Sequence, residues 1–201
     1  MIRGMGIIGY DAVAVGDDDL QYGADWLLKQ SKKAKLPLVS ANCFDADNKP
    51  IFPTHVYVKK GSKRIAITAL TTTEKIMQID KKVIIGDPYS SLKKIWREMV
   101  DNSDYQIIIS HLGNEKPAEL ASSLPECDLF VNGHRKNETS AVSLKNEIPV
   151  MQFGFQGKSL SYAVFKTDKK LQLEKYGWYI VDNNLPDDST ILSAINIRLK
   201  N

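Results

Sequence analysis

Apolar and polar residues follow one another along the chain in two rhythms, which predict strands and helices in turn. Short apolar runs are typical of buried strands, and we expect these at residues 12–15, 37–41, 56–58, 64–70, 105–110 and 129–131. Apolar residues at intervals of three or four are typical of helices that cover a sheet, and we expect these at residues 24–35, 89–100 and 118–124. In the first helix Trp26, Leu27 and Leu28 form the apolar side. A hairpin turn is expected at Lys60-Gly61-Ser62.

The pattern changes after residue 140 and becomes almost entirely β. Strands are expected at residues 141–144, 149–153, 160–166 and 171–181. A last helix at residues 189–199 follows Pro186-Asp187-Asp188, which supplies a turn and a helix start. The chain contains no internal repeat and no low-complexity linker, so residues 1–201 are expected to form a single layered α/β domain.

The composition is that of an ordinary globular protein and argues against several functional classes. The 201 residues include 27 basic and 24 acidic side chains, and a net charge of +3 indicates neither nucleic-acid binding nor attachment to a membrane surface. No apolar run approaches the roughly 20 residues of a membrane span, and the first residues lack the features of a signal peptide. Cys43 and Cys127 form no C-x-x-C motif, and we expect two buried thiols.

Three polar clusters each follow directly on a predicted buried strand. They are residues 16–19 (GDDD), 110–113 (SHLG) and 132–136 (NGHRK). Because neighbouring strand ends bring loops distant in sequence together, Asp17, His111 and His134 are expected to converge. Imidazole and carboxylate groups are common ligands of divalent metals. The spacing leaves open an alternative, in which both histidines only cap strands.

A series of short motifs runs along nearly the whole chain. They are residues 9–16 (GYDAVAVG), 22–23 (YG), 37–42 (PLVSAN), 64–72 (RIAITALTT), 110–113 (SHLG), 133–134 (GH), 149–152 (PVMQ), 157–160 (GKSL) and 186–188 (PDD). In this order they resemble the 5′-nucleotidase family of calcineurin-like metallophosphoesterases, whose pattern includes GYDA, GNHEFDYG, PvlsAN, SHLG and GHsH. Each motif is weak alone, and the series is specific.

The resemblance implies a layered metallophosphoesterase β-sandwich flanked by helices. The family domain begins with an Asp-x-His and a Gly-Asp strand end, and this chain is expected to begin after both. Residues 1–201 are therefore expected to correspond to the C-terminal two-thirds of that domain. Uncovered sheet edges tend to pair with other chains, so a dimer or a partner domain over these edges is expected.

The resemblance also assigns roles to individual residues. In the family one metal is held by the asparagine of GNHE and by the histidines of SHLG and GH, and the matching residues are Asp17, His111 and His134. The second metal needs the second histidine of GHsH, which is Lys136 here, and an ammonium group has no lone pair for a metal. The histidine of GNHE, which helps to stabilise the departing oxygen, is Asp18. We expect at most one weakly held divalent metal ion and no organic cofactor.

The function implied by the resemblance is hydrolysis of a nucleotide or another phosphate ester, weak or absent in this chain. The alternative is a non-catalytic module that binds a ligand or a partner protein. A third reading is that a longer protein supplies the missing ligands. Many family members work outside the cytoplasm, which implies a periplasmic location. Lys136 and Arg135 are expected to offset the mutual repulsion of Asp17, Asp18 and Asp19.

Overall fold

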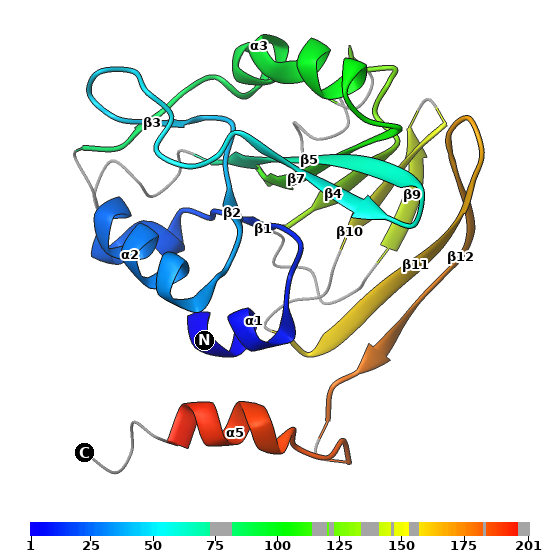
Figure 1. The fold of residues 1–201 in the computed structure, drawn as a ribbon. Helices are drawn as coiled ribbons and strands as arrows, with labels where there is room; N and C mark the ends of the chain where they lie inside the picture. Colours follow the sequence, from blue (N-terminus) through cyan, green and yellow to red (C-terminus); the bar gives the residue numbers. More distant parts are fainter. Residues whose placement is uncertain are drawn as a thin grey trace.

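A six-stranded mixed sheet forms the centre of the molecule (Figure 1). The computed structural model describes residues 1–72, 82–113, 120, 123–133, 141–145, 147–152, 157–182 and 184–196. The strands of the central sheet, in spatial order, are β4 (His55–Lys60), β5 (Lys63–Thr71), β7 (Tyr105–His111), β8 (Leu129–Asn132), β10 (Ile148–Gln152) and β9 (Ala141–Lys145). The four inner strands run parallel, and an antiparallel partner lies at each edge.

The inner strands are mostly buried along their length, as is typical of parallel strands covered on both faces. Helix α3 (Pro88–Asp101) buries Leu92, Trp96 and Met99, one turn apart, in the same core as Phe130 of β8. The Asp87 side chain accepts a hydrogen bond of 2.8 Å from Ser90 N and so caps the helix start. Figure 1 shows α3 lying along the top of the sheet.

The first part of the chain builds a second core from short elements. They are α1 (Ile2–Ile8), β1 (Val13–Ala14), the 3₁₀ helix η1 (Asp18–Tyr22), α2 (Ala24–Ala34), β2 (Leu38–Val39), β3 (Cys43–Phe44) and β6 (Ile84–Ile85). Strand β1 pairs in parallel with β2, and β3 pairs with β6. Helix α2 buries Leu27 as expected, but Trp26 is 41% exposed, so the predicted apolar side is only partly covered.

The hairpin of β11 (Ser159–Thr167) and β12 (Leu171–Ile180) extends along the right-hand side of Figure 1. Within the described residues its two strands pair only with each other. The turn of the hairpin is held to the body, since Tyr105 Oη donates to Asp168 O at 2.8 Å and Leu171 N donates to Asp128 Oδ1 at 3.3 Å. Helix α5 (Ser189–Asn196) follows and lies next to α1.

The predicted class, α/β with layered strands and helices, is confirmed, and the central sheet is mixed. The strands expected after residue 140 are all present. Most of the helix expected at residues 118–124 and the end of the helix expected at 189–199 lie outside the described residues. In the part of the chain that is described, no helix is long and apolar enough to cross a membrane. The dimer or partner domain stays a prediction.

Candidate functional site

The ends of four strands meet at one edge of the central sheet. Thr71, the last residue of β5, is paired with His111, the last residue of β7. Ser110 of β7 is paired in turn with Asn132, the last residue of β8. The loop after β1 lies against this edge, because its Asp17 contacts the side chain of His111.

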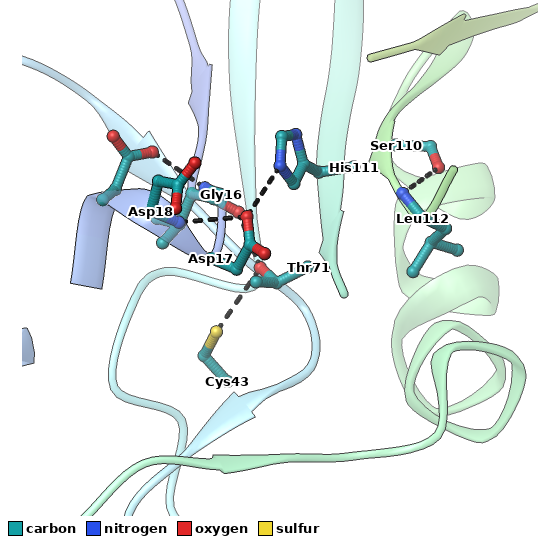
Figure 2. A network of polar contacts seen from close by, with 10 residues as sticks. Gly16, Asp17, Asp18, Cys43, Thr71, Ser110, His111 and Leu112 are labelled. Atoms are coloured by element: carbon teal, nitrogen blue, oxygen red, sulfur yellow. Dashed lines mark hydrogen bonds and ion pairs between the residues drawn. The ribbon is translucent and has the colours of Figure 1, made fainter. Parts of the chain in front are cut away.

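Asp17 and His111 are in direct contact, as the polar clusters predicted. The distance between Asp17 Oδ1 and His111 Nε2 is 3.1 Å (Figure 2). The Asp17 side chain is fully buried and that of His111 is 28% exposed, so the pair is reached from solvent on the His111 side. Asp17 Oδ1 also accepts a hydrogen bond of 3.0 Å from Asp18 N. The carboxylate is thus held in one orientation by the start of η1.

Gly16 allows the His111 ring to approach the loop closely. A Cβ atom on Gly16 would lie 3.1 Å from His111 Nε2 and 3.2 Å from its Cε1, too close for an unstrained contact. Gly16 N donates a hydrogen bond of 2.8 Å to Asp19 Oδ2, which closes the loop. Loss of solvent around the carboxylate raises the pKa of Asp19, although the Gly16 hydrogen bond and nearby His111 oppose the shift. Asp18, the residue at the family's catalytic histidine position, is exposed.

The third predicted ligand, His134, lies outside the described residues, as do Arg135 and Lys136. Gly133, the residue before it, lies beside His111. Gly133 N donates to Ser110 O at 2.7 Å, and a Cβ on Gly133 would lie 3.7 Å from His111 Nδ1. The expected ion pairs of Lys136 and Arg135 with the acidic loop therefore stay predictions.

Asp17 and His111 can serve as neighbouring ligands of one divalent cation. When the ligand atoms lie about 2.0–2.2 Å from a divalent cation, two adjacent ones are roughly 3 Å apart in octahedral geometry and roughly 3.4 Å apart in tetrahedral geometry. The observed 3.1 Å fits such a ligand spacing as well as a direct hydrogen bond. Over the described ranges no group of three His, Cys, Asp or Glu side chains could hold a metal. His55, the third histidine, lies on β4 and contacts Thr54 and Glu98 instead.

The structure adds polar residues that the sequence reasoning did not single out. Ser40, Asn42 and Thr71 are fully buried and hydrogen-bonded beside the Asp17 loop. Asn132 is 1% exposed; its Nδ2 donates to Gly113 O at 3.2 Å, and its Oδ1 accepts no hydrogen bond from a described residue. The signal was available, because each of these residues is polar and stands at or just after the end of a predicted strand.

The sequence is similar to that of curated 5′-nucleotidases, although no family model matches it. It is 35% identical over 153 residues to a 5′-nucleotidase of Vibrio cholerae, covering 66% of this chain and 27% of the relative. It is 31% identical over 149 residues to Protein UshA of Escherichia coli, covering 73% of this chain and 26% of the relative. The chain spans about a quarter of the length of these relatives.

Several solved structures share the fold. The 5′-nucleotidase precursor from Thermus thermophilus superposes with a TM-score of 0.77 at 24% identity, covering 99% of this chain and 46% of the other. The calcineurin-like phosphoesterase YfkN from Bacillus subtilis gives a TM-score of 0.79 at 18% identity, covering 98% of this chain and 71% of the other. At these identities the likeness concerns the fold alone.

Proposed function

Because the chain belongs to the 5′-nucleotidase family and has the fold of calcineurin-like phosphoesterases, we propose that it binds one divalent cation and hydrolyses phosphate esters weakly or not at all. The observation that carries this proposal is the contact between Asp17 and His111 at the edge of the sheet. Two donors of the types that such a cation prefers are held together there, one on the loop after β1 and one at the end of β7. His134 is proposed as a third ligand, on the family resemblance.

The residues of the acidic loop support loss of catalysis. Asp18 occupies the position of the family's histidine, and its exposed carboxylate would repel an approaching phosphate ester where the histidine would stabilise a departing oxygen. Lys136, at the position of a ligand for the second metal, cannot donate a lone pair. A bound cation would supply Lewis-acid polarisation of a phosphoryl oxygen, and hydrolysis in two-metal sites relies on a pair of cations.

The role of the chain's own residues would be to bind the cation and to orient the carboxylate that holds it. Asp17 is buried and accepts a hydrogen bond from Asp18 N, which fixes one carboxylate oxygen towards His111. Asp19 accepts from Gly16 N and shapes the loop. A phosphate ester would therefore meet a preformed but acidic site, in which attraction depends on the bound cation.

Calorimetric titration of the purified chain with Mn²⁺, together with an assay of AMP and p-nitrophenyl phosphate hydrolysis, tests this proposal. We expect one ion per chain, bound weakly, and hydrolysis at or near background. His111→Ala should abolish Mn²⁺ binding. His55→Ala is the matched control, because it removes a histidine that does not contact Asp17, and it should leave binding unchanged.

Two results would contradict the proposal. One is binding of two ions per chain with metal-dependent turnover of either ester, and the other is binding of one ion that survives His111→Ala. The combined change Asp17→Asn, Asp18→His and Lys136→His restores the family's residues and should raise the affinity for Mn²⁺. Metal binding without any hydrolysis in the unaltered chain would favour the non-catalytic module.

A further inference from the structure

A buried polar network lies directly beneath the candidate site. Ser40, Asn42 and Thr71 are each 0% exposed; Ser40 and Asn42 lie between β2 and β3, and Thr71 ends β5. Buried polar side chains are costly unless hydrogen-bonded, and the described contacts connect all three. We infer that Thr71 and Asn42 are positioning residues, which hold the loop carrying Asp17 against His111. The inference rests on the proposed cation site and assigns residues that support it.

Thr71 connects the two segments that carry Asp17 and His111. It is paired with His111 in the adjacent strand, and its Oγ1 donates a hydrogen bond of 2.8 Å to Val15 O. Val15 is followed directly by Gly16 and Asp17. Figure 2 draws Thr71 in the same network of polar contacts as Asp17 and His111. The Thr71 hydroxyl therefore links the end of β5 to the start of the acidic loop at residues 16–19.

The direction of the neighbouring hydrogen bonds follows from the donors available. A hydroxyl has a single proton, and a carbonyl oxygen only accepts, so Thr71 gives its proton to Val15 O. In the 2.9 Å contact between the hydroxyls of Ser40 and Thr71, Ser40 then donates its one proton to Thr71 rather than to Asn42 Oδ1, which lies farther away at 3.4 Å. Cys43 Sγ also donates to Thr71 Oγ1, at 3.4 Å. The Thr71 hydroxyl is thus oriented from both sides.

Asn42 fixes the backbone of the same residue. Its Oδ1 accepts from Thr71 N at 2.8 Å and its Nδ2 donates to Thr71 O at 2.8 Å, so the side-chain amide pairs with Thr71 as a neighbouring strand would. The second proton of Nδ2 goes to Gly86 O at 3.1 Å. Both amide protons are used, and aspartate at this position could supply neither. Asn42 therefore holds the end of β5 in place. Because Thr71 in turn donates to Val15 O, Asn42 also helps to fix the Val15 carbonyl.

Thr71→Val is the informative substitution, because it replaces the hydroxyl by a methyl group of similar size. The matched control is Thr68→Val on the same strand. Thr68 is also 0% exposed and donates to Thr54 O at 2.7 Å, away from Asp17 and His111. Thr71→Ser keeps the hydroxyl and should restore whatever Thr71→Val loses.

We expect the two valine variants to lower the urea midpoint of unfolding by similar amounts but to differ in their affinity for Mn²⁺. Supporting residues around metal ligands typically change affinity about 10- to 100-fold, so Thr71→Val should weaken Mn²⁺ binding at least about tenfold. Thr68→Val should leave the affinity within about twofold. A Thr71→Val variant that binds Mn²⁺ as Thr68→Val does would overturn the inference.

A second readout needs no metal and separates this inference from the proposed function. The imidazole ¹⁵N resonances of His111 report its contact with Asp17, and they should move in Thr71→Val, stay in place in Thr68→Val and return in Thr71→Ser. If the unaltered chain binds no Mn²⁺, the proposed function fails and this comparison still decides the positioning role. Should Thr71→Val not fold, Ser40→Ala, which removes the proton given to Thr71, should shift the same resonances. Unmoved His111 resonances in the variants that fold would overturn the inference.

Discussion

Two regions of the molecule are held by different kinds of interaction. One is the site edge, which consists of residues 15–17, Ser40, Asn42, Thr71 and His111, and the other is the β11–β12 hairpin. At the site edge, residues that follow β1 and β2 meet the ends of β5 and β7 through buried and partly buried side-chain hydrogen bonds that span up to 94 positions in the sequence. In the hairpin the contacts are mostly local, and Leu160, Trp178, Tyr179 and Ile180 are 52–68% exposed. The hairpin turn is joined to the body by hydrogen bonds from Tyr105 Oη to Asp168 O, from Leu171 N to Asp128 Oδ1 and from Lys170 Nζ to Pro125 O.

The difference indicates where substitutions should lower the stability of the fold most. A small two-stranded ribbon is marginally stable alone, so the hairpin depends on its attachment to the sheet. The arrangement of the site edge depends on hydrogen bonds between several elements, so a substitution in one element also displaces residues of the others. Substitutions should therefore be costly at the site edge and in the sheet, and mild in the outer part of the hairpin.

The largest contrast is expected between Phe130→Ala and Trp178→Ala. Phe130 is 0% exposed in the centre of the sheet, and its truncation should lower the free energy of unfolding by about 3–5 kcal/mol. Trp178 is 52% exposed, and we expect its truncation to cost less than about 1 kcal/mol. Urea unfolding of the two variants measures both values. Equal losses would show that the hairpin is packed far more tightly than its exposure indicates.

Asp128→Asn should destabilise the junction between the sheet and the hairpin. Asp128 accepts hydrogen bonds from Gln106 N at 2.9 Å and from Leu171 N at 3.3 Å, one on each oxygen. An asparagine has one acceptor oxygen, so a buried N–H would lose its partner at a cost of about 1–3 kcal/mol.

The same variant should change the dependence of stability on pH. Burial raises the pKa of Asp128, although the hydrogen bonds from Gln106 N and Leu171 N oppose the shift. A carboxyl group with a raised pKa in the folded state favours folding when protonated, below its unfolded pKa of about 3.9, and loses this contribution as the pH rises through the folded pKa. The stability difference between the unaltered chain and Asp128→Asn should therefore be larger near about pH 3 than near about pH 7. A difference that grows with pH would contradict the assignment.

Tyr105→Phe should loosen the hairpin with a smaller loss of overall stability. The substitution removes only the hydroxyl that donates to Asp168 O at 2.8 Å, and we expect a cost of about 0.5–1.5 kcal/mol. Hydrogen exchange should become faster at amides of β11 and β12 than at those of β5 and β7. Uniform acceleration across all four strands would mean that the hairpin opens only with the whole domain.

The smallest expected effect concerns the two thiols, one at the site edge and one beside Asp128, which anchors the hairpin. Cys43 contacts Thr71 at the site edge, and Cys127 lies next to Asp128. Burial raises the pKa of the Cys43 thiol and raises the pKa of Cys127 to about 12. Neither thiol should react readily with a disulfide reagent at about pH 8 in the folded chain, and both should react in urea. Rapid reaction of either thiol in the folded chain would show that its surroundings open.

The sequence predicted the parts of the fold that carry strong apolar periodicity. The hairpin at Lys60-Gly61-Ser62, helix α3 and the inner strand β7 appear where expected. It did not predict α1, whose Gly4 and Gly6 weaken the helical signal. The two-residue strands β3 and β6 were also missed, because so short a pairing is set by tertiary contacts and leaves no periodic pattern.

At the site, the sequence predicted the residues better than their surroundings. The convergence of Asp17 and His111 followed from their positions just after apolar strands, and it is confirmed. The assignment of these residues as metal ligands, with His134, stays a prediction. The roles of Asn42 and Thr71 were not predicted, because a hydrogen bond between residues 29 positions apart depends on how two strand ends meet.

Anomalous diffraction from crystals of the chain soaked in Mn²⁺ would decide whether the site holds a single cation, since it counts the bound ions and identifies their ligands. We expect a single anomalous peak within bonding distance of Asp17 and His111. Two peaks at the bridging distance of a two-metal site, roughly 3.5–4 Å apart, would contradict this expectation, as would a single peak that contacts neither residue.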